Sequence, residues 1–187
     1  MSAVYRGRTF LLLTVIYLAV AVPFRSLEFI VGLTDVRPVC MLMPVYGLFF
    51  GPIGAFAFAV GNVLSDAASG SLSTASIGGI IANFAAVYTY HLVWNRRGGN
   101  GPSLANLRSA AGYLAVALLA AGVTVAILVP AVHWSFPSAS TAYFARVIMV
   151  NNTVFALVPG MALIVIMRAE YRMRAYGHMR GGQHHAR

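Results

Sequence analysis

Charge is the scarcest property of this sequence. Only 9% of its 187 residues are Asp, Glu, Lys or Arg, and 59% are hydrophobic. An average soluble domain has roughly 25% charged residues. A chain with so few charges is not built to cover itself with a soluble surface, so the composition predicts an integral membrane protein. The length fits a single transmembrane domain over residues 1–187, because six helices of about 20 residues would use most of it.

Lysine is missing and cysteine is nearly so. All thirteen basic residues are Arg, and they stand between hydrophobic runs rather than along one stripe, which argues against nucleic-acid binding despite the net charge of +9. Cys40 is the only cysteine, so an intramolecular disulfide and a multi-cysteine metal site are excluded. We find no phosphate-binding glycine loop, nucleophile elbow or metal-binding histidine spacing. The sequence therefore predicts neither a cofactor nor an enzyme.

Apolar runs separated by short polar segments predict an all-α membrane fold of six helices. Their approximate ranges are 9–24, 38–50, 53–68, 73–94, 109–132 and 141–167, with a basic tail over 168–187. The second range is too short to cross about 30 Å of hydrocarbon at 1.5 Å per residue, so we expect its neighbours or the preceding loop to shield it. Gly51-Pro52 predicts a tight turn between the second and third helices.

The arginines give this bundle an orientation. With the N-terminus inside, ten arginines fall on the cytoplasmic side, Arg25 and Arg37 fall outside, and Arg146 falls within the sixth helix. Such a bias follows the positive-inside rule only when the number of helices is even. We therefore expect both termini in the cytoplasm, and the outer ends of the helices as the place where polar chemistry collects.

The strongest polar signal lies at the outer end of the third helix. Asn62 and Asp66 are one turn apart and point the same way. A carboxylate buried in lipid needs a partner or water, and either Arg37 or Arg146 could pair with it. A ligand site and a structural clasp between helices explain such a pair equally well.

Other candidates come from the fourth to sixth helices. Asn83 and Asn151 lie deeper, where an amide needs a hydrogen-bonding partner or a wet cavity, so helix-to-helix bonding and ligand contact are both open. Trp134 and Tyr143 fall near the outer helix ends and could stack on a ring. The predicted substrate-binding set is Arg37, Asp66, Asn62, Asn83, Trp134, Tyr143, Arg146 and Asn151.

Small residues recur at four-residue spacing in the second to fourth helices. They are Gly47/Gly51, Ala55/Ala59, Ala57/Gly61 and Gly78/Ala82/Ala86. This pattern predicts close approach of these helices, since small side chains let helix backbones come near each other in a membrane.

The order of motifs over residues 32–94 is distinctive. It consists of Val36-Arg37-Pro38 at the end of an external loop, the short second helix, Phe50-Gly51-Pro52-Ile53-Gly54-Ala55, Gly61-Asn62 with Asp66, and Ile81-Ala82-Asn83-Phe84, continued by Asn151-Asn152 in the sixth helix. In this order the chain resembles the S components, the substrate-binding subunits of energy-coupling factor (ECF) vitamin transporters. Because it has an arginine in the first external loop, the chain is most similar to the queuosine-precursor transporter-like group.

The resemblance implies a subunit in the plasma membrane of a prokaryote that binds a vitamin or nucleobase-like metabolite from outside, in a pocket roofed by loops one, three and five. It also implies partners, namely a membrane T component and cytoplasmic ATPases. Two alternatives stay open. One is a structural or assembly membrane subunit, and the other is a small intramembrane enzyme using Asp66 as acid or base, although no second titratable partner stands at a fixed spacing from it.

Overall fold

Nearly all of the chain that the structure describes is helical. The computed structural model describes residues 3–25, 28–30, 34–96 and 107–169. The long helices are α1 (Ala3–Ala21), α3 (Gly51–Ala68), α4 (Ala75–Arg96), α5 (Leu107–Ser135) and α6 (Thr141–Phe155). A 3-10 turn, Val22–Phe24, extends α1, and a π-helical turn, Ala156–Gly160, leads from α6 into helix that continues to residue 169.

Five helical segments are long and apolar enough to cross a membrane. They are Val4–Phe24, Pro38–Ala68, Ala75–Arg96, Leu107–Ser135 and Thr141–Ala169, with mean hydropathy between 1.2 and 2.5. Large apolar side chains such as Leu11, Leu12 and Val15 of α1 face outward, which suits a helix surrounded by lipid because lipid tails are as apolar as leucine. The predicted helical and apolar architecture is confirmed in these residues.

The segment Pro38–Ala68 doubles back on itself. Its first arm is a 3-10 turn (Pro38–Met41), the short α2 (Leu42–Val45) and a π-helical turn (Tyr46–Phe50), and its second arm is α3. The rings of Tyr46 and Phe58 lie 6.0 Å apart, whereas residues twelve apart in one straight helix would be separated by about 18 Å. The reversal falls at Gly51, whose φ of 55° is readily available to glycine alone. The predicted turn at this point is confirmed.

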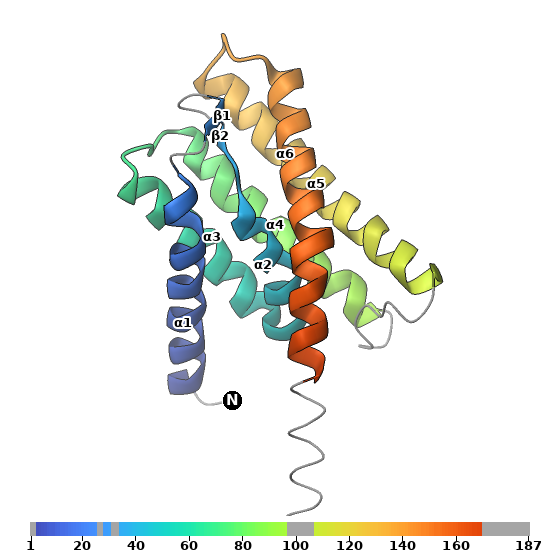
Figure 1. Ribbon diagram of the computed structural model, residues 1–187. Helices are drawn as coiled ribbons and strands as arrows, with labels where there is room; N and C mark the ends of the chain where they lie inside the picture. Colours follow the sequence, from blue (N-terminus) through green and yellow to red (C-terminus); the bar gives the residue numbers. More distant parts are fainter. Residues whose placement is uncertain (1–2, 26–27, 31–33, 97–106, 170–187) are drawn as a thin grey trace, which may run out of the picture.

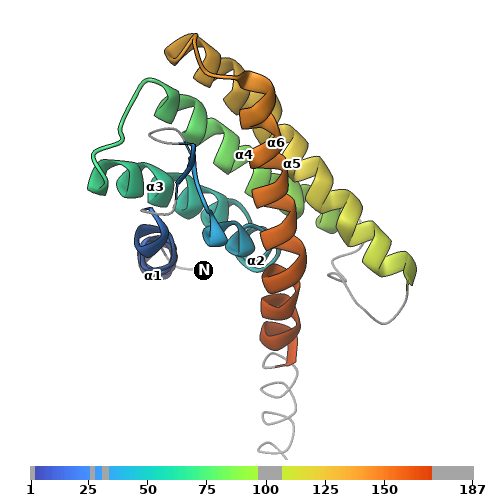
Figure 2. The ribbon, with the colours of Figure 1, turned by 45° about the horizontal axis from the view of Figure 1, so that its top comes forward.

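With the two arms counted separately, the helical segments run alternately up and down through the bundle. The N-terminal end of α1 and the C-terminal end of the last helix lie at the same lower end, as Figure 1 shows. In Figure 2, α1 stands at one side against α3, and α5 and α6 lie together at the other. The short arm is enclosed by its neighbours, since Val39, Cys40, Met43 and Tyr46 are almost fully buried. This enclosure meets the expectation that the short helix is shielded.

Several predicted boundaries are wrong. The first helix begins at Ala3 rather than near residue 9, because Arg6 and Arg8 sit exposed on its surface and do not interrupt it. The fifth helix spans Leu107–Ser135 rather than 109–132. The segment between the first two predicted helices contains β1 (Glu28–Ile30), which pairs antiparallel with β2 (Thr34–Asp35). Of the predicted tail, residues 170–187 lie outside the described part.

Small residues permit the closest helix contacts. A Cβ atom on Gly61 of α3 would lie 2.6 Å from the ring of Tyr17 on α1, so α1 could not keep its place beside a larger residue. Gly47 similarly abuts Tyr90 of α4, and Gly78 abuts Ala131 of α5. The predicted close packing of the second to fourth helices is confirmed, with α1 and α5 as additional partners.

Candidate functional site

The polar side chains of the bundle gather where α3 ends. The helix stops with Gly70 at a φ of 69°, and Ser71 N–H donates to the Asp66 carbonyl at 2.9 Å while Gly70 N–H donates to the Ala67 carbonyl at 3.2 Å. These two bonds form a Schellman motif, which satisfies carbonyls that the helix end would leave unpaired. The last turn of α3 is thereby fixed, and it holds Ser65 and Asp66 toward α1.

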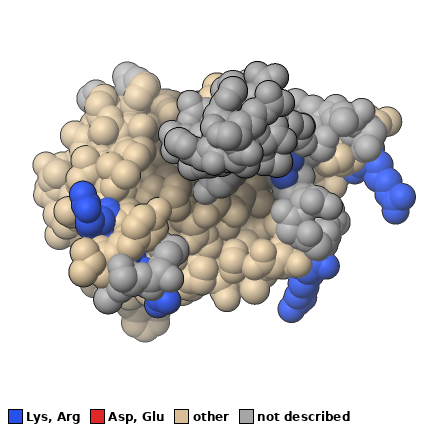
Figure 3. Space-filling view, turned by 90° about the horizontal axis from the view of Figure 1, so that it is seen from below, with Lys and Arg blue, Asp and Glu red and all other residues tan. Residues whose placement is uncertain are grey.

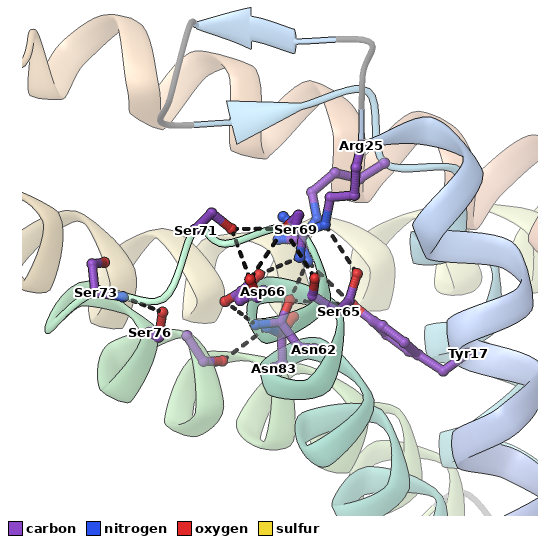
Figure 4. A network of polar contacts seen from close by, with 12 residues as sticks. Tyr17, Arg25, Asn62, Ser65, Asp66, Ser69, Ser71, Ser73, Ser76 and Asn83 are labelled. Carbon is purple, nitrogen blue, oxygen red and sulfur yellow. Dashed lines mark hydrogen bonds and ion pairs between the residues drawn. The ribbon is translucent and has the colours of Figure 1, made fainter.

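Asp66 forms an ion pair with Arg25. The Arg25 Nη2 donates to Asp66 Oδ1, and its Nε donates to the Ser65 hydroxyl at 2.9 Å. The two side chains are only 20% and 14% exposed, so water weakens this attraction less than it would at an open surface. Figure 4 shows the Arg25 side chain pointing from the turn after α1 toward the end of α3.

Arg37 joins the same group through Asn62 and Tyr17. Its guanidinium donates to the Asn62 Oδ1 and, at 3.2 Å, to the Tyr17 hydroxyl. Tyr17 in turn donates to Asn62 Oδ1 at 3.2 Å, and Asn62 Nδ2 donates to Asp66 Oδ2 at 3.3 Å. Asn62 therefore connects the two arginines and the acid. We call these residues the polar cluster: Tyr17, Arg25, Arg37, Asn62, Ser65 and Asp66.

Asparagines of α6 bind the start of the short arm to the rest of the bundle. Asn151 Oδ1 accepts from the Arg37 backbone N–H at 3.4 Å. Asn152 Oδ1 accepts from the Cys40 thiol at 3.1 Å, and its Nδ2 donates to the Thr124 hydroxyl of α5 at 3.0 Å. All of these side chains are buried. They form a polar connection from α5 through α6 to the residues beside Arg37.

Asn83 contributes an acceptor that no described group satisfies. Its Nδ2 donates to the Gly79 carbonyl at 2.8 Å, and its Oδ1 is buried without a protein partner. A Cβ atom on Gly79 would lie 3.3 Å from Asn62 Nδ2, and Figure 4 shows Asn83 beside Asn62. Because an unpaired buried amide oxygen costs about 1–3 kcal/mol, this position suits a bound water or a polar ligand.

The structure therefore brings together part of the predicted substrate-binding set. Arg37, Asn62, Asp66 and Asn151 are linked by hydrogen bonds, and Asn83 lies next to them. Trp134 is 86% exposed and Tyr143 is 48% exposed, and Arg146 is also exposed on α6. No described contact joins these three to the polar cluster.

The predicted partner of Asp66 is corrected to Arg25. We expected Arg37 or Arg146, but the turn after α1 carries Arg25 directly over the end of α3. Sequence reasoning also missed Tyr17 and Ser65 as members of the cluster. The signal for Tyr17 was weak, because Thr9 and Thr14 carry hydroxyls in the same apolar stretch and nothing in the sequence singles out Tyr17. The structure shows that Tyr17 is fully buried and bonded to Asn62.

The polar cluster leaves little free space in this conformation. The hollow beside Tyr17, Arg25 and Arg37 measures about 10 Å³, which is close to the minimum for one water molecule. Among the described residues, no group of three His, Cys, Asp or Glu side chains could hold a metal ion. The cluster offers two guanidiniums, one carboxylate and several amides, so it can recognise a small polar molecule by charge and hydrogen bonding.

These observations define the class of protein. It is a helical bundle whose apolar helices are long enough to span a membrane and which buries a polar cluster at one end. Comparisons of the chain with protein-family models, with curated proteins and with solved structures found no match.

Proposed function

We propose that this chain is the substrate-binding subunit of an ECF-type transporter, an S component that captures a vitamin or nucleobase-like metabolite. The observation that carries the proposal is the polar cluster at one end of an apolar bundle, in which Arg37, Asn62 and Asp66 meet. Ionisable groups inside a membrane segment are costly and usually serve a substrate or ion pathway. The order of sequence motifs points to the same class. Three members of the cluster, Arg37, Asn62 and Asp66, belong to those motifs.

In this proposal Arg37 and Arg25 face an anionic or carbonyl group of the ligand, and Asp66 faces an amine. Asn62, Asn83 and Asn151 recognise polar edges, as convergent polar groups do in pockets with an apolar lining. Because the hollow is small, the ligand has to displace some of the internal hydrogen bonds. A T component and cytoplasmic ATPases are the proposed partners that drive release inward.

The proposed topology has six membrane crossings, with both termini in the cytoplasm and the polar cluster at the outer side. It can be tested by labelling, since the native Cys40 is fully buried. Ser71→Cys and Tyr5→Cys each place one exposed thiol at opposite ends of the bundle. An impermeant maleimide added to intact cells should label the first and spare the second; the reverse pattern would overturn the orientation.

The function is tested by purifying the chain in mild detergent and identifying bound small molecules and co-purifying subunits by mass spectrometry. Binding of a vitamin and nucleobase panel is then compared in Arg37→Ala and in Arg146→Ala, a matched loss of one arginine outside the cluster. We expect Arg37→Ala to weaken binding about tenfold or more, since a charge-assisted hydrogen bond is lost. Unchanged affinity in Arg37→Ala would remove it from the site.

A structural or assembly role is the second candidate, and one observation favours it. The side chains of the polar cluster bond to one another across α1, α3 and the residue that precedes the short arm, so the cluster can clasp these elements together. If no panel compound binds, and replacement of Asp66 lowers only the stability of the chain, this role is the better account.

A further inference from the structure

The end of the bundle opposite the polar cluster contains a second, larger cavity. It has a volume of about 160 Å³ and is lined by Gly47, Leu48, Phe49, His91, Trp94, Asn95 and Arg168. The lining comes from the π-helical turn before Gly51, from the end of α4 and from the last helix. The proposed transport function does not use this cavity, and the inference below does not depend on that function.

Side-chain donors dominate the polar part of this lining. Arg168 supplies a half-buried guanidinium, and Asn95 and His91 supply an amide and an imidazole that are joined at 3.0 Å. The Tyr88 ring packs against the His91 ring at 5.5 Å, and a Cβ atom on Gly51 would lie 2.9 Å from the same ring. His91 is thus held between the chain reversal and α4, which keeps one wall of the cavity in place.

The charged residues that the structure describes around the cavity are all basic. No described lining residue is acidic. Figure 3, which looks onto this end from below, shows arginine side chains around a surface of uncharged residues and no acidic side chain on the part formed by the described residues. Arg6, Arg8, Arg96 and Arg108 are exposed in the helix ends that face this way. Their summed field attracts anions toward the cavity.

We propose that this cavity binds a phosphate or phosphodiester group. A guanidinium presents a fixed fork of donors that matches phosphate oxygens, and the remaining oxygens can accept from the imidazole and the amide on the facing wall. The ligand's source is either the head group of an anionic phospholipid or a soluble phosphate. Basic pockets between membrane helices at the cytoplasmic side bind phospholipid head groups in this manner.

The test uses the whole chain in neutral detergent with Trp134→Phe, so that fluorescence reports on Trp94 in the cavity wall. Inorganic phosphate, a short-chain phosphatidylglycerol and the phosphatidylcholine of equal chain length are titrated separately. We expect a saturable change with at least one of the two anions, and weaker binding of the zwitterionic lipid. Binding of phosphatidylglycerol without binding of inorganic phosphate assigns the site to a lipid, and the converse assigns it to a solute.

Two variants decide whether the cavity itself is responsible. Arg168→Gln should weaken binding about tenfold or more, whereas Arg8→Gln, which removes one exposed charge at the same end, should change it less than about twofold because solvent screens it. Leu48→Phe keeps every charge and narrows the cavity, so it should weaken binding. It also keeps the test decisive if Arg168→Gln does not fold. Equal losses in the two arginine variants, full binding in Leu48→Phe, or no saturable change with either anion would overturn the proposal.

Discussion

The two ends of the bundle treat their charged groups in opposite ways. At the upper end, Arg25 meets Asp66 and Arg37 meets Asn62, and only about 10 Å³ stays open beside them. At the lower end, the cavity beside Arg168 is about 160 Å³, and no described residue of its lining is acidic.

The difference teaches how charge balance shapes space inside an apolar bundle. Opposite charges in surroundings of low dielectric attract strongly and draw their helices together, so the polar cluster closes on itself. Among the described residues, no acid stands in the wall beside Arg168, and the larger cavity lies there. The upper end is thus tied to the stability of the fold, while the lower end has room for a small ligand.

Loss of the acid should have the largest effect. Asp66→Asn leaves Arg25 partly buried without its counter-charge, and we expect the free energy of unfolding to fall by about 3 kcal/mol, the lower end of the range for breaking a buried pair. The measurement is denaturant unfolding in detergent. The double variant Arg25→Gln with Asp66→Asn should recover much of the loss, because no unpaired charge remains; a double variant as unstable as the sum of the singles would contradict the pairing.

Crowding of α1 against α3 should cause the second-largest loss of unfolding free energy. A methyl group on Gly61 would stand 2.6 Å from the Tyr17 ring, and overpacking of this kind costs about 2 kcal/mol. Gly61→Ala should therefore lower the unfolding free energy and displace the Tyr17 hydroxyl from Asn62, with the lower cavity unaffected. Gly122→Ala is the matched control, because nothing lies within 4 Å of a Cβ atom there. Equal destabilisation by the two substitutions would refute the close approach.

Substitutions at the lower end should lower the unfolding free energy less. His91→Leu removes the hydrogen bond to Asn95, which is exposed, so we expect a loss below about 1 kcal/mol in unfolding free energy. The same denaturant titration checks it. A cost as large as that of Asp66→Asn would show that the two ends contribute equally to stability, and the contrast between them would fail.

Replacement of Arg146 should have the smallest effect. This residue is exposed on α6, so Arg146→Gln should change the unfolding free energy by no more than about 0.5 kcal/mol. It serves as the reference for Asp66→Asn, since both remove one charge from the upper half of the bundle. A substantial loss in Arg146→Gln would place it in a polar contact and enlarge the cluster.

The sequence was sufficient where local rules apply. Long apolar runs require helices in a membrane because every backbone group must be paired internally, and Gly51-Pro52 marks the turn because glycine tolerates a positive φ. Helix ends were predicted less well. The first helix was expected to begin near residue 9, but it includes Arg6 and Arg8, because arginine is a good helix former and does not stop a helix.

The candidate site shows the same division. Asn62 and Asp66 could be recognised from one sequence segment, since their spacing fixes their common direction on a helix. Trp134, Tyr143 and Arg146 were grouped with them because all were expected near the outer helix ends. Position along a helix axis does not determine which way a side chain faces across the bundle, and these three face outward.

The sequence by itself determined an apolar, helical chain with a turn at Gly51 and a polar pair at the end of α3. Only the tertiary structure decided that Arg25, rather than Arg37 or Arg146, balances Asp66. It also decided that Tyr17 and Arg37 meet at Asn62, and that Asn151 bonds to the Arg37 backbone. It alone also revealed the cavity beside Arg168. The physical reason is that these contacts join residues 25 to 114 positions apart, and their geometry depends on how α1, α3 and α6 pack rather than on any local pattern.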